Sequence, residues 1–280
     1  RTVTPHFYAL EHFGVDIKTT EKNYEVTCTP KKPEEIILYE SGDTVTENVL
    51  FAAAKFPGTT TIKYASANYM VQEICIFLQL LGVKIEGIGT TTLKVTGVES
   101  INQNVSYTLS EDPTDSMFFL ATAIVTNSTI TITRCPIEFL ELELLKLEKM
   151  GFKYTKTKPY LSENGFTKLV DITTKPSHLK ALHEKIHPSV YPGLNIDNLP
   201  FFAVIATQAE GQTLIHDWVY EKRAIYFTEL EKLGAETVLA DPHRIYITGP
   251  TVLKPVELIC PPALRPATIL LIAMLGAKGH

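Results

Sequence analysis

Arginine, paired cysteines and long apolar runs are all scarce in this sequence. Only five of the 26 basic residues are arginine, and the four cysteines are widely spaced, with no CxxC pair. This spacing excludes a disulfide-rich scaffold and a CxxC zinc module, and it indicates buried or half-buried thiols in a reducing compartment. The longest apolar stretch, Ala267–Ala277, is interrupted by Thr268 and Gly276 and is too short to span a bilayer. Since no basic-then-apolar leader opens the chain, we expect a cytoplasmic protein.

The remaining composition is that of an ordinary globular protein. The chain has 280 residues, of which 45% are hydrophobic and 20% charged, and its formal net charge is −5. At about 150 residues per domain, this length predicts two domains. A generic nucleic-acid binder would be basic, so we expect no nucleic-acid partner. The net charge does not exclude a small anionic substrate, because individual arginines suit bidentate contacts with carboxylates and phosphates.

An internal repeat is the strongest pattern in the chain. A helix pattern that ends in an apolar residue and glycine recurs at intervals of 68, 69 and 83 residues. An apolar helix followed by a turn and a Thr-x-Ile strand recurs at intervals of 69, 84 and 68 residues. The turn residues of the two series are Gly14, Gly82, Gly151 and Gly234, and Gly58, Asn127, Gly211 and Gly279. Two series with one period, each with one insertion, indicate a repeated structural unit.

Each repeat predicts the order strand, helix, strand, helix, strand, strand, and therefore an α+β fold. The first helices, expected at 48–56, 116–125, 199–209 and 266–275, are apolar nearly all round, which predicts burial on every side. The second helices, expected at 71–81, 139–150 and 225–233, are amphipathic and end at glycine. We expect two similar domains, residues 1–108 and 109–280, both incomplete at the chain ends.

Ligands are expected at the N-termini of the four apolar helices, because free N–H groups and the helix dipole attract anions there. For any single Ser, Thr, Asp or Asn in these segments, an N-cap is the simpler role. Arg265 is different, since a cation at a helix N-terminus opposes the dipole and calls for an anion nearby. That anion is either a neighbouring carboxylate or a ligand.

In their order and spacing, several segments resemble the enolpyruvyl transferase family, and most closely its branch that acts on UDP-N-acetylglucosamine. The matching segments extend over nearly the whole chain and include Thr46-Glu47-Asn48, Leu81–Thr90, Tyr191-Pro192-Gly193, Val219–Arg223, Leu233–Glu236 and Leu264-Arg265. The resemblance implies an inside-out α/β barrel in two similar domains of βαβαββ units. It also implies transfer of the enolpyruvyl group from phosphoenolpyruvate to the 3-hydroxyl of UDP-N-acetylglucosamine, with release of phosphate, in peptidoglycan precursor synthesis. No cofactor and no metal are implied.

The resemblance also assigns roles to individual residues. Asp197 matches the family carboxylate proposed as the base for the sugar hydroxyl, and Arg265 matches a catalytic arginine that holds phosphoenolpyruvate. The substrate-binding positions that it implies are Arg1 and Val3 on the nucleotide side, Ser41, Gly42 and Asp43 in the diphosphate loop, Val219 beside the sugar, and Arg223 at phosphoenolpyruvate. An aspartate at position 43 would repel a diphosphate unless it caps the helix.

The sequence also departs from the family pattern. The loop cysteine that supplies a proton would precede Arg1, and an N-terminal Lys-Asn pair and a late arginine are also absent from this chain. Ala263 stands where the family usually has an aspartate, and Asp112-Pro113 replaces an arginine-containing stretch. These departures predict a fragment of a divergent member, without a defined general acid, that does not turn over by itself.

Three alternatives stay open. Enolpyruvylshikimate-phosphate synthase has the same fold, and Asn195–Pro200 has some likeness to it, but its Ser-rich and basic substrate motifs are missing. A non-catalytic relative that binds a UDP-sugar or a partner protein would explain Ala263 and Pro113. His183–His187 spells the HExxH sequence of zinc proteases, but Pro188 would end the helix that such a site needs. For this last segment we expect a solvated helix or loop.

Overall fold

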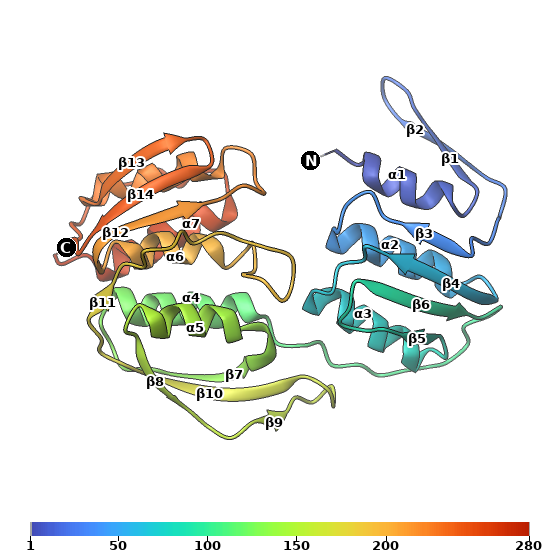
Figure 1. Ribbon diagram of the computed structural model, residues 1–280, viewed down its shortest axis with the longest axis horizontal. Helices are drawn as coiled ribbons and strands as arrows, with labels where there is room; N and C mark the ends of the chain where they lie inside the picture. Colours follow the sequence, from blue (N-terminus) through green and yellow to red (C-terminus); the bar gives the residue numbers. More distant parts are fainter. Residues whose placement is uncertain (1, 280) are drawn as a thin grey trace. The chain divides into compact units, whose positions relative to one another are not determined.

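The chain forms two compact units, each with a hydrophobic core of its own. In this computed structural model, residues 2–279 are described, and the division falls between Leu109 and Ser110. We call Arg1–Leu109 unit 1 and Ser110–His280 unit 2 (Figure 1). The buried apolar residues of each unit form a separate cluster. None of the helices within residues 2–279 has the length and apolarity needed to cross a lipid bilayer.

Unit 1 contains three helices, a two-stranded hairpin and a four-stranded sheet. In chain order its elements are α1 (Thr4–Glu11), β1 (Val15–Thr19), β2 (Tyr24–Cys28), β3 (Glu35–Ile37), α2 (Asp43–Ala54), β4 (Gly58–Lys63), α3 (Tyr69–Leu80), β5 (Lys84–Glu86) and β6 (Thr92–Gly97). The sheet has the order β3-β4-β6-β5, in which β3 runs parallel to β4 and the other neighbours are antiparallel. Helix α2 packs against α1, α3 and β6.

Unit 2 contains two sheets and a central group of helices. In chain order its elements are α4 (Pro113–Val125), β7 (Thr131–Pro136), η1 (Ile137–Phe139), α5 (Glu141–Lys149), β8 (Lys153–Lys156), β9 (Tyr160–Leu161), β10 (Lys168–Lys175), β11 (Leu179–Lys180), α6 (Leu199–Ala206), β12 (Ala209–His216), η2 (Arg223–Leu233), β13 (Glu236–Asp241), β14 (Arg244–Gly249) and α7 (Leu264–Gly276). The sheet orders are β7-β10-β8, with β9 beside β10, and β11-β12-β14-β13.

The sheets of the two units repeat the same strand order, as the sequence predicts. In unit 1 the order is β3-β4-β6-β5, and in unit 2 the order β11-β12-β14-β13 has the same parallel and antiparallel pairings. The register agrees as well, because Gly58 lies opposite Gly97 and Gly211 lies opposite Gly249. The sheet β7-β10-β8 has the antiparallel part of this arrangement.

The eight turn residues of the repeat share one backbone feature. All of them have positive φ, between 49° at Asn127 and 128° at Gly279. A Cβ atom is strained in this left-handed region, so glycine and, more rarely, asparagine occupy it. The periodic glycines in the sequence therefore mark the turns that follow successive helices.

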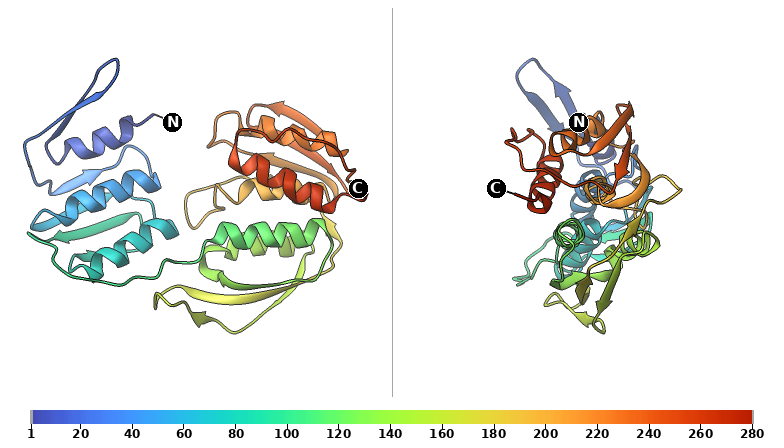
Figure 2. Two further views of the ribbon diagram at one scale, coloured as in Figure 1. Left: turned by 180° about the vertical axis from the view of Figure 1, so that it is seen from behind. Right: turned by 90° about the vertical axis from the view of Figure 1, so that its left-hand side faces the viewer.

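Three apolar helices form the centre of unit 2. Helices α4, α6 and α7 pack against one another, and Figure 2 shows α4 and α7 running side by side from behind. Every residue of α6 is buried, as the sequence predicts for the first helix of each unit. That prediction is wrong for α7, where Leu271, Met274 and Leu275 are about half exposed, and it fails in part for α2 and α4, which expose Phe51 and Phe119. The reason is that α7 packs on α4, α6 and η2, and these neighbours cover one side of it.

Three further expectations need correction. The helix expected at 225–233 is the 3₁₀ segment η2, whose residues 225–228 are four successive aromatic or β-branched residues of modest α-helix propensity. The sheets described within residues 2–279 are open, so no closed barrel is formed. Cys75 and Cys135 are buried, as expected for structural thiols, but Cys28 and Cys260 are exposed.

Candidate functional site

The loop that leads into α6 carries Asp197. This loop begins after Tyr191-Pro192, and it reaches the helix at Asn198, the N-cap residue, whose side chain makes no capping hydrogen bond. The backbone N–H of Asp197 donates to Oδ1 of Asn195 over 2.8 Å, which closes a tight turn. The carboxylate of Asp197 is left partly exposed, two residues before the helix begins. The dipole of α6 favours a negative charge in this position.

Arg265 lies next to Asp197, although 68 residues separate them in the chain. Arg265 is in the first turn of α7, and its Nε lies 3.6 Å from Oδ1 of Asp197. Both side chains remain partly accessible, with 23% of Arg265 and 34% of Asp197 exposed. The structure therefore brings the two expected catalytic residues together at the N-termini of α6 and α7. A pair at this distance, open to solvent, leaves both groups available to a ligand.

The guanidinium group of Arg223 contacts other residues of unit 2. Its guanidinium donates from Nε to Oδ2 of Asp217 and from Nη2 to the carbonyl oxygen of Ile196, over 2.8 Å. The carboxylate of Asp217 is fully buried, and Arg223 is only 8% exposed. Its guanidinium also lies 4.2 Å from the centre of the Tyr220 ring, within the range of a cation–π contact. Arg223 thus binds the peptide group directly before Asp197.

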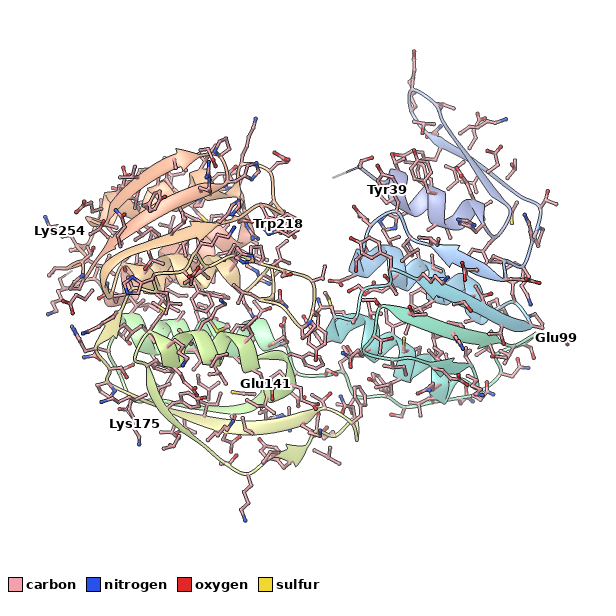
Figure 3. All side chains as sticks on the ribbon, viewed as in Figure 1. Tyr39, Glu99, Glu141, Lys175, Trp218 and Lys254 are labelled. Carbon is pink, nitrogen blue, oxygen red and sulfur yellow. The ribbon has the colours of Figure 1, made fainter. Side chains whose placement is uncertain are left out.

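Val219 lies in the loop between β12 and η2. It is partly buried and follows Trp218, which is half exposed and whose indole N–H donates to the carbonyl oxygen of Pro188 over 2.9 Å (Figure 3). The same loop is fastened by His243, since its Nδ1 lies 2.9 Å from the carbonyl oxygen of Asp217. The segment that carries Val219 and leads to Arg223 is therefore held from two sides.

In unit 1, the expected diphosphate loop forms the N-terminus of α2. Gly42 is the N-cap and Asp43 the first helical residue. Asp43 uses both carboxylate oxygens, because Oδ1 accepts from Ser66 Oγ at 2.5 Å and Oδ2 from Asn68 Nδ2 at 2.9 Å. Ser41 donates to the carbonyl oxygen of Ala65 over 3.3 Å. This segment is thus tied to the loop before α3, and Asp43 makes no capping bond to its own helix.

Side-chain N-caps are less common at these helices than expected. Among the four apolar helices, only α4 has one, where Asp112 accepts from the N–H of Thr114 at 2.7 Å. Asp43 instead carries its charge close to Glu47, and burial together with that charge raises the pKa of Glu47. The N-terminus of α2 therefore gathers negative charge from two carboxyl groups.

The two remaining candidates lie at the start of the chain. Val3 is the N-cap residue of α1 and is 42% exposed, so its side chain is free to contact a ligand. Arg1 lies outside the described residues. Val3, Ser41, Gly42 and Asp43 belong to unit 1, whereas Asp197, Val219, Arg223 and Arg265 belong to unit 2.

The HExxH segment is not helical. His183 and His187 lie in an extended loop in which Ile186 forms a bridge with Ile215 of β12. His183 is exposed, and Nδ1 of His187 lies 3.2 Å from the carbonyl oxygen of Pro188. The shared helical face of a zinc protease is thus not formed. Within residues 2–279, no group of three or more His, Cys, Asp or Glu side chains is placed to hold a metal ion.

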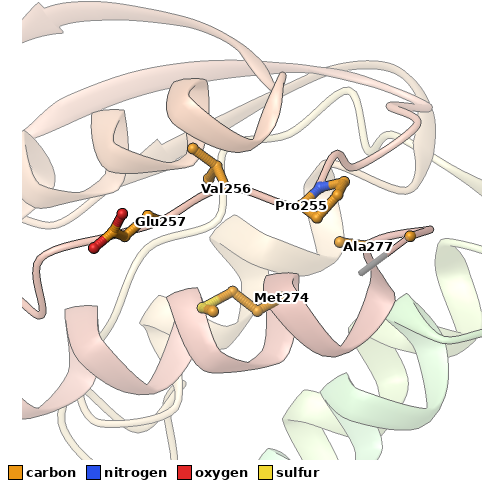
Figure 4. A pocket seen from close by; sticks show the side chains of 6 residues that line it. Pro255, Val256, Glu257, Met274 and Ala277 are labelled. Carbon is orange, nitrogen blue, oxygen red and sulfur yellow. The ribbon is translucent and has the colours of Figure 1, made fainter.

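A groove of about 480 Å³ lies beside the C-terminal half of α7 (Figure 4). Its lining includes Pro255, Val256, Glu257, Met274 and Ala277, most of which are apolar. The polar groups that converge on a typical substrate site are not gathered there. The groove is separate from the expected site residues, none of which lines it.

Comparison with known proteins places this architecture in a family. The sequence profile described as EPSP synthase (3-phosphoshikimate 1-carboxyvinyltransferase) matches residues 1–280. The chain belongs to the EPSP synthase/enolpyruvyl transferase family. Relatives named UDP-N-acetylglucosamine 1-carboxyvinyltransferase include those of Treponema denticola, 32% identical over 285 residues, and Bacteroides thetaiotaomicron, 30% identical over 284 residues. These matches cover 100% of this chain and 64% of each relative, so the chain spans just under two thirds of their length.

Solved enolpyruvyl transferases share the fold. The enolpyruvyl transferase NikO from Streptomyces tendae superposes with a TM-score of 0.82 at 24% identity, covering 100% of this chain and 66% of that one. An EPSP synthase from Acinetobacter baumannii gives a TM-score of 0.77 at 19% identity, covering 100% and 65%. At these identities the likeness supports the fold alone.

Two buried acids of this enolpyruvyl transferase family member were not anticipated from sequence. Glu143 lies on α5 and accepts hydrogen bonds from the loop that carries Asp197, and Asp217 pairs with Arg223. Glu143 has a sequence signal, because it falls at a helical spacing between the apolar residues Leu140 and Leu147. An acid on an apolar face indicates a buried partner. Asp217 has a weaker signal, since it directly follows a strand.

Proposed function

We propose that this chain carries part of an enzyme that transfers the enolpyruvyl group of phosphoenolpyruvate to the 3-hydroxyl of UDP-N-acetylglucosamine and releases phosphate. Support comes from family membership and from relatives of that name at about 30% identity over the whole chain. The proposal includes small-molecule substrates, no nucleic-acid partner and a cytoplasmic location. It also includes the substrate-binding roles of Arg1, Val3, Ser41, Gly42, Val219 and Arg223. Asp43 is included through its hydrogen bonds with Ser66 and Asn68, which hold the loop, since its uncapped charge would repel a diphosphate.

The observation that carries the proposal is the pair of Asp197 and Arg265. A partly exposed carboxylate and a partly exposed guanidinium lie 3.6 Å apart at the N-termini of the buried helix α6 and the partly exposed helix α7. The reaction needs a base for a hydroxyl group and a cation for the carboxylate or phosphate of phosphoenolpyruvate. The two groups match these needs, and the free N–H groups of both helices add positive potential for an anionic substrate.

The chemistry then proceeds by addition and elimination. Asp197 accepts the proton of the sugar hydroxyl while the hydroxyl oxygen forms a bond to C2 of phosphoenolpyruvate. A proton adds to the methylene carbon of phosphoenolpyruvate in the same step. Loss of a proton from that carbon, with cleavage of the bond between C2 and the phosphate oxygen, gives the enolpyruvyl ether and phosphate. Arg265 offsets the negative charge of the bound phosphoenolpyruvate during both steps.

Ligand binding tests this proposal. We expect titration calorimetry on this chain to detect UDP-N-acetylglucosamine binding and to show that it strengthens the binding of phosphoenolpyruvate. Because this chain is expected not to turn over by itself, phosphate release is assayed in the full-length enzyme. Asp197→Asn removes the base but keeps the shape, so we expect it to abolish phosphate release. Asp241→Asn is the matched control, because Asp241 also pairs with an arginine, Arg244 Nε at 2.6 Å, but lies outside the site.

Titration with shikimate-3-phosphate as an additional ligand also separates the alternative functions. Binding of shikimate-3-phosphate instead of the UDP-sugar would overturn the proposed substrate in favour of enolpyruvylshikimate-phosphate synthesis. Binding of the UDP-sugar without any effect of phosphoenolpyruvate would favour a non-catalytic relative. Equal effects of Asp197→Asn and Asp241→Asn on binding and phosphate release would remove Asp197 from the site.

A further inference from the structure

Glu143 is a buried carboxyl group that the proposed chemistry does not use. It lies in the first turn of α5, and only 2% of the residue is exposed. Burying a carboxyl group is unfavourable unless hydrogen bonds compensate. Burial raises the pKa of Glu143, and the hydrogen bond from Asn198 acts in the opposite direction. The hydrogen-bond partners of Glu143 therefore show which part of the structure this buried carboxyl group holds.

Its hydrogen bonds go to the turn that carries Asp197. Oε1 of Glu143 accepts from the side-chain Nδ2 of Asn198 at 2.8 Å and from the backbone N–H of Asn195 at 3.3 Å. These two residues lie on either side of Ile196 and Asp197. One carboxylate oxygen on a different helix therefore fastens both ends of a four-residue turn.

One further hydrogen bond within the turn extends this constraint to Asp197. Oδ1 of Asn195 accepts from the N–H of Asp197, so the residue that Glu143 fixes also fixes the peptide group of Asp197. On the other side, Arg223 donates to the carbonyl oxygen of Ile196. The backbone of the turn is thus held at three successive residues, while the carboxylate of Asp197 is left 34% exposed beside Arg265.

We propose that Glu143 is a positioning residue, which holds the turn from Asn195 to Asn198 so that the Asp197 carboxylate is preorganised for the hydroxyl of its substrate. This inference rests on the proposed function for the identity of that substrate, but the constraint on the turn does not depend on it. A carboxylate suits the task because it accepts two hydrogen bonds at one oxygen, and charge strengthens both. Preorganisation of a catalytic group depends on such supporting contacts.

Hydrogen exchange tests the constraint without any ligand. We expect Glu143→Ala to speed amide exchange at Asn195 and Asp197 at least about 10-fold, a change of about 1.4 kcal/mol in local opening, with little change in the buried helix α6. Glu143→Gln keeps an acceptor oxygen and should give an intermediate effect. Glu141→Gln is the control, since Glu141 is exposed on the same helix (Figure 3). Unchanged exchange in the turn would overturn the inference.

A double-mutant cycle distinguishes positioning from a general structural role. We expect Glu143→Ala to weaken UDP-N-acetylglucosamine binding about 10-fold in the wild-type background and hardly at all in the Asp197→Asn background. An equal loss in both backgrounds would mean that Glu143 acts on the unit as a whole and would overturn the inference. If wild type binds none of this ligand, the proposed function fails, while the exchange experiment still decides whether Glu143 holds the turn.

Discussion

A cation in the first turn of a helix is unfavourable by itself, and Arg265 shows how this protein compensates for it. The dipole of α7 repels the guanidinium, and Asp197, at 3.6 Å, supplies an opposite charge. Because both groups are partly exposed, this pair contributes little to stability. An anionic substrate would therefore meet a guanidinium that is only loosely engaged by the protein.

Replacing Arg265 by lysine separates binding from stability. Arg265→Lys keeps the charge but loses the planar fork that contacts a carboxylate through two N–H groups. We expect a melting temperature close to that of wild type and phosphoenolpyruvate binding weaker by about 2–4 kcal/mol, which is about 30- to 1000-fold. Calorimetry in the presence of UDP-N-acetylglucosamine measures the affinity, and Arg244→Lys is the matched control. A large fall in melting temperature with unchanged affinity would make Arg265 a structural residue.

The buried Glu143 predicts a pH dependence of stability. Its pKa is raised by burial, with Asn198, Asn195 and the charge of Lys146 opposing the shift, so the folded protein holds this proton more tightly than the unfolded chain. The free energy of unfolding should then fall as pH rises from about 4.3, the usual value for Glu, through the raised pKa. Glu143→Gln cannot titrate. We expect wild type to lose stability relative to this variant over that window in urea unfolding, and a constant difference would contradict the expectation.

At the scale of elements, two glycines explain why the strand that each of them ends packs against the end of a helix in the same way in both units. Gly97 ends β6 and Gly249 ends β14. Gly97 lies against carbonyl groups at the C-terminal end of α2, and Gly249 lies against those at the C-terminal end of α6. A Cβ at Gly97 would lie 2.3 Å from the carbonyl oxygens of Ala53 and Phe56. At Gly249 it would lie 2.6 Å from that of Ala209. The last strand can therefore approach the helix end only without a side chain.

Gly97→Ala is expected to destabilise unit 1 because backbone atoms, not a flexible side chain, occupy the space. Overpacking of this kind costs about 1–3 kcal/mol, and we expect the upper end of that range. Lys94→Ala, at an exposed position of the same strand, should change stability by less than about 0.5 kcal/mol. Urea unfolding of both variants measures the difference. Equal stabilities would show that β6 can shift away from the end of α2.

Elements and their order could be predicted from sequence because they depend on local patterns. The positive φ angles at Gly82 and Gly234 follow from the need to end a helix, and this need is visible as a period in the sequence. The exposed side of α7 could not be predicted, since it depends on which elements pack against the helix. The site is similar in this respect. Asp197 is expected in the site from a family resemblance, whereas the proposed role of Glu143 depends on a hydrogen bond to a loop 52 residues away.

At the scale of the whole molecule, the two units have separate hydrophobic cores. The core of unit 1 is built around α2 and the sheet β3-β4-β6-β5, and the core of unit 2 around α4, α6 and α7. The two clusters have no residue in common. Since the stability of a cooperative unit depends mainly on its own core, we expect the two units to open independently.

Matched core substitutions test this independence. Leu50 in α2 and Leu120 in α4 are both fully buried, so a change to alanine at either one removes the same groups and costs about 2–5 kcal/mol. We expect Leu50→Ala to accelerate amide exchange in α2 and β4 but not in α4 or α6, and Leu120→Ala to do the reverse. Hydrogen exchange followed by mass spectrometry measures both regions in one sample. If either variant accelerated exchange equally throughout residues 2–279, the chain would unfold as a single cooperative unit, and the separation of the cores would have no thermodynamic consequence.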